Sequence, residues 1–381
     1  MGNHSSSIRH SLRLVRSEGV GSVIFGRLLA FFGSIDAILG ASAASLARVE
    51  GVGEKTAEKI FRSRNDFDVE KELELADKFG VCILDLTDER YPAALKKIYD
   101  PPPVIYIKGD VRPSDGLAVA IVGSRRCSTY GTEQAQRFAH LLAAAGFTIV
   151  SGMARGIDSA AHLGALSAGG RTLAVQGCGL SHIFPPENKS LFDKISQSGA
   201  CISELPMEYE PLPENFPPRN RIIAGLSLAT IVIEAMPRSG ALLTAKAALE
   251  NNREVMAIPG RIDSPLSRGP HGLIKQGAKL VESVEDVIDA LEFLQKDFAQ
   301  HVENSSKKEI EKTQKLLFDT SKLNLSKEEQ KILDCLDGEE VHIEELIAKS
   351  ELPAGKVNAT LISMRLKGIV KQFPGNYFAK R

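Results

Sequence analysis

The stretch "AVAIVGSRRCSTYG" at residues 118–131 decides the fold of this chain. An apolar run ends at Gly123, and a polar loop with two arginines follows. A buried strand that ends in a glycine turn is typical of the first unit of a dinucleotide-binding fold. The loop departs from the G-x-G-x-x-G pattern, because Ser124, Arg125 and Arg126 follow the glycine. The pattern therefore predicts the strand and the turn of that fold, with a different ligand at the turn.

The same alternation repeats through residues 111–294. "FTIVSG" (147–152) precedes "GIDSAAHLGALSAG" (156–169), and "LATIVIEA" (228–235) precedes "SGALLTAKAALENN" (239–252). Nearly continuous apolar strands that alternate with amphipathic helices indicate a parallel sheet covered on both faces. We predict an α/β domain with a Rossmann-like, doubly wound, mostly parallel sheet. Such domains bind their ligands at the carboxyl ends of the strands.

Residues 1–110 are predicted to form a helical N-terminal domain. Apolar residues recur at helical spacing in "IFGRLLAFFGSIDAIL" (24–39). The segment "LARVEGVGEKTAEKI" (46–60) resembles a helix-hairpin-helix module, whose turn presents backbone N–H groups to a DNA phosphate. A packed helical hairpin whose glycines only form the turn explains the segment equally well, so both interpretations remain open.

The C-terminal part of the chain is predicted to be a polar linker, residues 295–323, followed by a winged helix, residues 324–381. The winged helix follows from the order of three helices and a turn at "PGN" (374–376). In a DNA-binding winged helix, the third helix would enter a major groove. Winged helices also serve as protein–protein modules, and this region carries nine basic and nine acidic residues. Its candidate DNA contacts are Lys356, Arg365, Lys367 and Lys371.

Composition limits the classes of protein that the chain can belong to. The formal net charge is −1, so binding to a polyanion requires a local basic patch. The five cysteines are scattered and form no C-x-x-C pair, which indicates a reducing compartment and argues against a zinc site. The chain contains no apolar stretch long enough to span a membrane. We expect a cytoplasmic protein with neither metal nor cofactor.

Groups that can bind phosphate follow several of the predicted strands. A mononucleotide needs one such loop, whereas several loops along one sheet edge suit an extended polyanion. Arg126 and Arg238 can also be explained as solvated loop charges, and packing in the core or a loop is favoured over base stacking for Phe184, Phe192 and Phe216. The candidate DNA-binding residues are Gly123, Ser124, Arg125, Ser151, Gly152, Lys189, Arg219, Asn220, Arg221, Ser239, Gly240 and Thr244.

Evidence for catalysis in the sequence is weak. The chain has no G-x-S-x-G elbow and no Walker A lysine, and its histidines lack metal-ligand spacing. Asp158 and Glu234 follow predicted strands and are the one pair that could serve as acid and base. We predict that the protein is not an enzyme.

Six ordered motifs closely resemble the DNA-processing protein A family (DprA, also called Smf). They are "GSRRCSTYG", "SGMARGIDSAAH", "PPENK", "FPPRNRIIAGLS", "EAMPRSGALLTAKAALENNREVMAIPG" and "SRGPHGLIKQGA". The resemblance implies a non-enzymatic homodimer that binds single-stranded DNA and loads RecA in natural transformation and recombination. It also implies that Arg125 and Lys189 hold the DNA. Ala241 departs from the family pattern, which has serine there, so a phosphate role for that position is in doubt.

Two other classes of function remain. The chain shares a predicted fold with nucleoside-phosphate hydrolases that resemble the cytokinin-activating "LOG" proteins. Those enzymes need a glutamate after a glycine-rich loop, where this chain has alanine and lysine in "PRSGALLTAKAA" (237–248). The other alternative is a transcription regulator that reads duplex DNA through the winged helix. A preference for duplex over single strands would favour the regulator.

Overall fold

A computed structural model describes residues 5–291, 325–336, 341–366, 369–373 and 375–380. It divides into two compact units, which are described separately. One comprises Met1–His140 and Phe147–Val281, and the other comprises Leu141–Gly146 and Glu282–Arg381. The predicted linker, 295–323, lies outside the described residues. No described helix combines the length and the apolar character that crossing a membrane requires.

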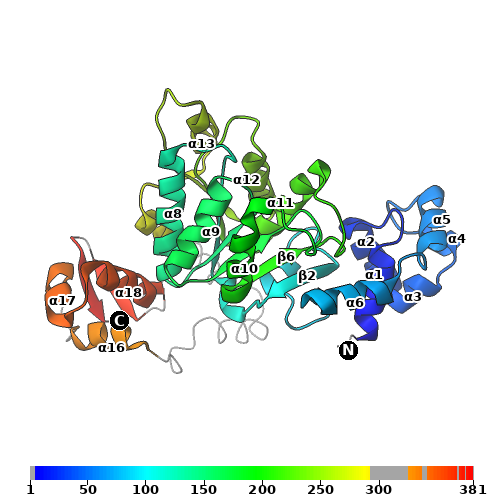
Figure 1. Cartoon of the computed structure of the whole chain (residues 1–381), viewed down its shortest axis with the longest axis horizontal. Coiled ribbons are helices and arrows are strands. Elements are labelled where there is room, and N and C mark those ends of the chain that lie inside the picture. Colours follow the sequence, from blue (N-terminus) through cyan, green and yellow to red (C-terminus); the bar gives the residue numbers. More distant parts are fainter. Residues whose placement is uncertain (1–4, 292–324, 337–340, 367–368, 374, 381) are drawn as a thin grey trace. The chain divides into compact units, whose positions relative to one another are not determined.

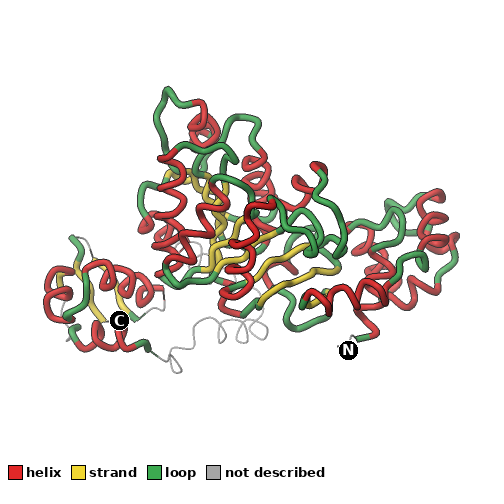
Figure 2. Tube along the Cα trace, in the orientation of Figure 1, coloured by secondary structure: helices red, strands yellow, loops and turns green. Residues whose placement is uncertain are grey.

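The first unit is built on a nine-stranded sheet in the order β1-β2-β6-β5-β4-β3-β7-β8-β9 (Figures 1 and 2). The strands from β3 to β9 pair with one another in parallel, whereas β2 pairs antiparallel with β1 and with β6. The strands are β1 Cys82–Asp85, β2 Val104–Gly109, β3 Ala118–Val122, β4 Thr148–Ser151, β5 Thr172–Val175, β6 Ala200–Ser203, β7 Ala229–Val232, β8 Glu254–Ala257 and β9 Lys279–Leu280. The predicted doubly wound, mostly parallel fold is confirmed.

The order of the strands reverses between β3 and β7. From β3 the chain proceeds outward to β4, β5 and β6, and then returns to place β7 on the other side of β3. The last residues of these two strands, Val122 and Val232, are paired directly. Doubly wound sheets bind their ligands at such a switch point, outside the carboxyl ends of the strands. The loops after β3 and β7 therefore frame the expected position of a site.

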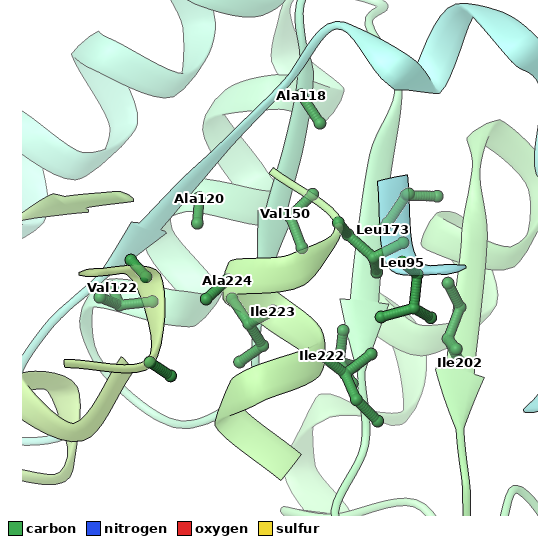
Figure 3. Packing of buried hydrophobic residues seen from close by; sticks show 14 of the residues in the cluster. Leu95, Ala118, Ala120, Val122, Val150, Leu173, Ile202, Ile222, Ile223 and Ala224 are labelled. Carbon is green, nitrogen blue, oxygen red and sulfur yellow. The ribbon is translucent and has the colours of Figure 1, made fainter. Parts of the chain in front are cut away.

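Burial explains why these segments form strands. Every residue of the five strands β3 to β7 is buried, so both faces of each strand lie in apolar surroundings. Figure 3 shows Ile222, Ile223 and Ala224 of one covering helix against the sheet. The helices of this part are α8 Thr129–Ala144, α9 Ile157–Ser167, α10 Lys189–Ser198, α11 Phe216–Gly225, α12 Gly240–Glu250 and α13 Arg268–Lys275.

The N-terminal region is helical as far as residue 79 and then joins the sheet. Its helices are α1 Ser6–Val15, α2 Ser22–Phe32, α3 Ile35–Gly40, α4 Ala43–Leu46, α5 Glu54–Ser63 and α6 Val69–Phe79, with α7 Ala93–Lys96 between the first two strands. The sequence pattern predicted a helical domain up to residue 110, whereas β1 and β2 lie within that range and extend the sheet. The antiparallel pairing of β2 depends on partners that are distant in the sequence.

The turn between α4 and α5 is shaped by a neighbouring arginine. Gly51 has a φ of +82°, and a Cβ at this position would lie 2.3 Å from Arg27 Nη1. Arg27 donates to the carbonyl of Glu50 at 3.1 Å. Val49 and Val52 on either side of the glycine are buried in a helical core. These contacts show that the turn itself requires a glycine at position 51. DNA binding by this hairpin stays a prediction.

The second unit contains the predicted winged helix. Its elements are α16 Lys327–Asp334, β10 Val341–His342, α17 Ile343–Ser350, α18 Ala354–Leu366, β11 Val370–Phe373 and β12 Tyr377–Lys380. The strands form an antiparallel sheet in the order β10-β12-β11. Ile332, Leu346 and Val357 belong to a separate apolar core. The winged-helix prediction is therefore confirmed.

Candidate nucleic-acid interface

Hydrogen bonds between the Ser124 side chain and the backbone of Arg126 fix the shape of the loop after β3. The Ser124 hydroxyl accepts from the Arg126 N–H at 3.1 Å and donates to the Arg126 carbonyl at 2.9 Å. A Cβ on Gly123 would lie 2.6 Å from Ile157 and 2.9 Å from the Glu234 carbonyl, so only glycine fits there. Arg125 and Arg126 follow this tight turn, and both are exposed. The loop thus presents two cations from a constrained backbone.

Arg125 lies over an aromatic pair. Its guanidinium carbon is 5.3 Å from the centroid of the Phe216 ring, and that ring is 5.4 Å from the ring of Phe184. A cation over an aromatic face is attracted by the quadrupole of the ring. Phe184 and Phe216 are half-buried, whereas Phe192 is buried in the core. The first two rings therefore belong to the surroundings of the loop, and Phe192 packs as expected.

A small pocket opens beside Arg125. Its volume is about 10 Å³, which is the space of about one water molecule. This space is smaller than a nucleobase. The lining residues are Arg125, Gly152, Ala154, Arg155, Phe184, Pro185 and Phe216.

Beneath the pocket, Arg219 joins three segments of the fold. Its side chain is buried and donates from Nη1 to the Gly152 carbonyl at 2.8 Å and also to the Val175 carbonyl. Burial lowers the pKa of Arg219 to about 10, against the opposing effect of Asp158. Burial likewise raises the pKa of Asp158 to about 6, and the nearby Arg219 limits that rise. Arg219 was predicted to bind DNA, but the structure places it inside the protein, where it holds the ends of β4 and β5 against α11.

Other predicted site residues also hold the loops together. Arg221 forms ion pairs with Asp100 at 2.8 Å and with Glu204 at 2.6 Å. Asn220 donates to the Gly240 carbonyl at 3.2 Å. The buried Ser151 hydroxyl donates to the Ile121 carbonyl at 2.7 Å, and Thr244 is buried. These four side chains do not stand at the surface beside Arg125.

The start of α12 is capped by Ser239. Its hydroxyl accepts from the N–H of Ala241 at 3.4 Å. Gly240 is exposed, and a Cβ there would meet open space. The side chain of Ala241 is buried, so the position that departs from the family pattern faces the interior. Ser239 and Gly240 are therefore accessible at a helix start.

Lys189 begins α10 and is exposed. The preceding Asn188 donates to the Met153 carbonyl at 2.8 Å and to the Ser159 hydroxyl at 2.9 Å. These two hydrogen bonds fasten the segment before α10 to the loop after β4 and to α9. Across the same two segments, Arg155 forms an ion pair with Glu187. Reasoning from the sequence missed Asn188, Arg155 and Glu187, because only their distant partners reveal what they do.

The acid/base pair considered from the sequence faces inward. Both carboxylate oxygens of Glu234 accept from Ser128, from its N–H at 2.8 Å and from its hydroxyl at 2.6 Å. Asp158 accepts from the Ala154 N–H at 3.3 Å and is buried beside Arg219. Within the described ranges, no three His, Cys, Asp or Glu side chains gather as metal ligands would.

Four of the cations that the sequence places after strands are exposed and have no carboxylate partner among the described residues. They come from the loops after β3 and β7 and from the start of α10, which are all at the carboxyl edge of the sheet. Clustered charge of one sign raises the local concentration of an oppositely charged ligand. The arrangement suits a polyanion. The four are Arg125, Arg126, Lys189 and Arg238.

Models of three protein families match successive parts of the chain. The model of DNA recombination-mediator protein A matches residues 82–292. A SAM-like helix-hairpin-helix tandem matches residues 12–66, and the DprA winged helix domain matches residues 318–376.

Curated relatives cover almost the whole chain. Protein Smf of Synechocystis is 36% identical over 96% of both chains, and protein Smf of Escherichia coli is 38% identical over 78% of this chain and 77% of its own. The X-ray structure of DprA from Streptococcus pneumoniae superposes with a TM-score of 0.66 at 36% identity, over 74% of this chain and 96% of that one. A DprA structure from Helicobacter pylori, described for its mode of binding single-stranded DNA, gives a TM-score of 0.51 at 31% identity, over 57% of this chain and 97% of that one. This chain therefore belongs to the DNA recombination-mediator protein A family, also called DprA or Smf.

Proposed function

We propose that this protein binds single-stranded DNA along the carboxyl edge of its nine-stranded sheet and loads RecA onto the bound strand. One observation carries the proposal. Four exposed cations at the strand ends, Arg125, Arg126, Lys189 and Arg238, have no carboxylate partner among the described residues. Their charge is therefore available to phosphates.

The pocket beside Arg125 supports contacts with phosphates rather than with bases. Its volume of about 10 Å³ is too small for a base. Phosphate contacts position a nucleic acid without reading its sequence, whereas base contacts specify a sequence. A strand held by its phosphates keeps its bases free to pair. The site thus suits a protein that holds many different strands.

The relatives support the same ligand. The Helicobacter pylori protein is described as binding single-stranded DNA, and the matched family is described as a recombination mediator. By similarity, this chain takes part in DNA processing and recombination. We propose Gly123, Ser124, Arg125, Gly152, Lys189, Ser239 and Gly240 as the residues nearest the strand, with Ser151, Arg219, Asn220, Arg221 and Thr244 supporting them from within.

The partners that we propose are RecA and a second copy of this chain. A dimer would present two strand sites, and the second contact would gain from a high effective concentration. The protein would act in the cytoplasm, in natural transformation and recombination, without catalysing a reaction. Loading requires that the strand be held until RecA covers the free bases.

Binding to a single-stranded oligonucleotide should be compared with binding to its duplex at several salt concentrations. We expect preference for the single strand and a slope of log affinity against log salt of about −0.7 for each phosphate contacted. Equal affinity for the duplex, or a flat response to salt, would contradict the proposed ligand. An oligonucleotide of permuted sequence serves as the control and should bind equally well.

The loading step is tested with RecA from the same organism on DNA coated with single-strand-binding protein. The intact protein should accelerate the RecA ATPase or strand exchange, and the Arg125→Ala variant should do so much less. If the intact protein gives no acceleration, the loader function is refuted. Turnover of nucleoside phosphates by the protein alone would instead support the hydrolase alternative.

A further inference from the structure

Doubly wound folds offer an anion site where β3 is followed by α8. Backbone N–H groups at the first turn of a helix point toward an anion, and the helix dipole favours negative charge there. In this chain that helix start lies at the switch point, beside the end of β7. Nucleotide phosphates bind at this position in the fold. Whether the position is open in this protein decides which phosphates it can accept.

A carboxylate of the protein already occupies the position. Glu234 follows β7, is 4% exposed, and accepts both the N–H and the hydroxyl of Ser128, the residue immediately before α8. The Ser128 hydroxyl in turn accepts from the N–H of Gly131 at 3.1 Å, as an N-cap does. The negative charge that a helix start favours is therefore supplied from within.

The carboxylate of Glu234 lies directly against the first turn of α8. A Cβ on Gly131 would lie 2.4 Å from Glu234 Oε2, so the carboxylate lies against the bare backbone of the first turn. The backbone of Glu234 also accepts from the N–H of Ser124 at 2.6 Å. The same residue thus fills the helix start and fixes the loop that carries Arg125.

We propose that Glu234 is a specificity-determining residue that closes the nucleotide-phosphate site of the fold and leaves Arg125 outside it. A free nucleotide then finds no enclosed phosphate site, while a strand gains by touching several exposed cations at once. This inference rests on the proposed function for its ligand, but the closure of the helix start can be tested without any DNA.

The test uses the full chain and inorganic phosphate. The melting temperature of the wild type should respond to phosphate no more than to chloride at equal ionic strength. The Glu234→Ala variant removes the carboxylate and should show a saturable rise in melting temperature with phosphate. Glu133→Ala is the matched control, because it removes an exposed carboxylate from α8 without touching Ser128. It should behave as the wild type does.

Competition against a labelled oligonucleotide gives a second readout. Adenosine monophosphate should compete about tenfold more strongly with the strand on Glu234→Ala than on the wild type, a change of about 1.4 kcal/mol. Glu234→Gln keeps the size of the side chain but removes its charge, and it should still exclude phosphate. This variant therefore distinguishes exclusion by the volume of the side chain from exclusion by its charge.

Two results would overturn the inference. One is saturable stabilisation of the wild type by phosphate, which can be measured even if Glu234→Ala does not fold. The other is a folded Glu234→Ala variant that responds to phosphate as Glu133→Ala does. Failure of the wild type to bind single strands would instead count against the proposed function, because the phosphate titrations do not depend on it.

Discussion

The strand-end loops and the winged helix both carry basic side chains, but they use them differently. Arg125 and Lys189 in the loops are exposed, and no described carboxylate pairs with either. On the winged helix, Lys356 pairs with Glu328 at 2.9 Å. Arg365 pairs with Asp289 at 2.9 Å, and its side chain is only 10% exposed. Lys371 is exposed, lies 4.9 Å from the centroid of the Phe373 ring and has no carboxylate partner among the described residues, whereas Lys367 lies outside them.

The difference shows that a count of charges does not locate a binding surface. An exposed ion pair contributes little to stability, yet it neutralises the field that would attract a polyanion. The segment 352–371 has no acidic residue in the sequence, but Lys356 and Arg365 pair with carboxylates from other parts of the chain. The strand-end loops are therefore the stronger candidate for phosphate binding.

Arg125→Ala is expected to weaken single-strand binding more than any other substitution in either region. Loss of a hydrogen bond to a charged group costs about 1.5–3 kcal/mol, which corresponds to roughly tenfold to a hundredfold weaker binding of a single strand. Fluorescence anisotropy with a labelled oligonucleotide measures the change, and thermal melting checks that the variant is folded. Lys189→Ala should behave similarly if both residues hold one strand.

Arg126→Ala is the matched control for this prediction. Arg126 belongs to the same loop and is also exposed, but it makes no contact with the Phe216 ring. Its loss should weaken binding far less and change the salt slope by less than the loss of Arg125. Equal and small effects of the two substitutions would mean that both arginines are ordinary surface charges.

The two regions should also differ in the response of their carboxylates to pH. Burial raises the pKa of Asp158 to about 6, whereas the hydrogen bond from Lys356 lowers the pKa of Glu328 to about 2. A raised pKa means that the folded state binds the proton more tightly than the unfolded state. The stability that Asp158 contributes is thus present below about pH 4 and is lost as the pH rises through 6.

Asp158→Asn should remove that part of the pH dependence. The free energy of unfolding of the wild type should fall by on the order of 1–2 kcal/mol between about pH 4 and pH 6 relative to the variant. Glu328→Gln should leave the part of this window above about pH 5 unchanged, because the contribution of Glu328 is lost as the pH falls below about 4.5 toward 2. Denaturant unfolding across the pH range measures both, and parallel curves for wild type and Asp158→Asn would contradict the assignment.

A smaller effect on single-strand affinity is expected when the carboxylate partner of a cation is replaced by an amide. Glu187→Gln removes the partner of Arg155 beside the pocket, so single-strand affinity should rise by a factor of about two to five, the range of one exposed ion pair. Glu328→Gln releases Lys356 on the winged helix and should not change single-strand affinity. If the second substitution raised single-strand affinity as much as the first, the contrast between the two regions would be lost.

The smallest effect should follow removal of residues 324–381. Single-strand affinity of the truncated protein should stay within about a factor of two of the intact protein, because the proposed phosphate contacts lie in the other unit. Duplex affinity, measured in parallel, reports what the winged helix adds. A large loss of single-strand binding would show that the winged helix is the principal DNA contact.

Local sequence was sufficient for the parts of the fold that depend on near neighbours. The apolar run before Gly123 and its repeats predicted the parallel strands, because a strand buried on both faces must be apolar throughout. The pairing of β2 with β6 could not be predicted, since it joins segments almost a hundred residues apart. The local sequence pattern was therefore enough to locate each strand along the chain. The neighbours of each strand in the sheet are determined by the tertiary fold.

The candidate site was predictable to a similar degree. Gly123 and Arg125 stand where the motif placed them, at the end of a buried strand. The sequence did not distinguish Arg125 from Arg219, because the partners of Arg219 are carbonyl groups of other strands. Glu234 was considered for acid/base chemistry, and only its contacts with Ser128 reveal that it fills a helix start.

The buried Arg219 has a consequence for which nucleic acids can bind. By fastening the ends of β4 and β5 to α11, it makes the edge rigid before any ligand arrives. Most of the conformational entropy that is lost on binding is then lost by the DNA. Sheets twist, so the strand-end loops follow a curved path. Duplex DNA has a persistence length of about 50 nm and resists such a path over a few nucleotides, whereas a single strand bends freely. Selection for single strands can thus arise from the mechanical stiffness of the ligand.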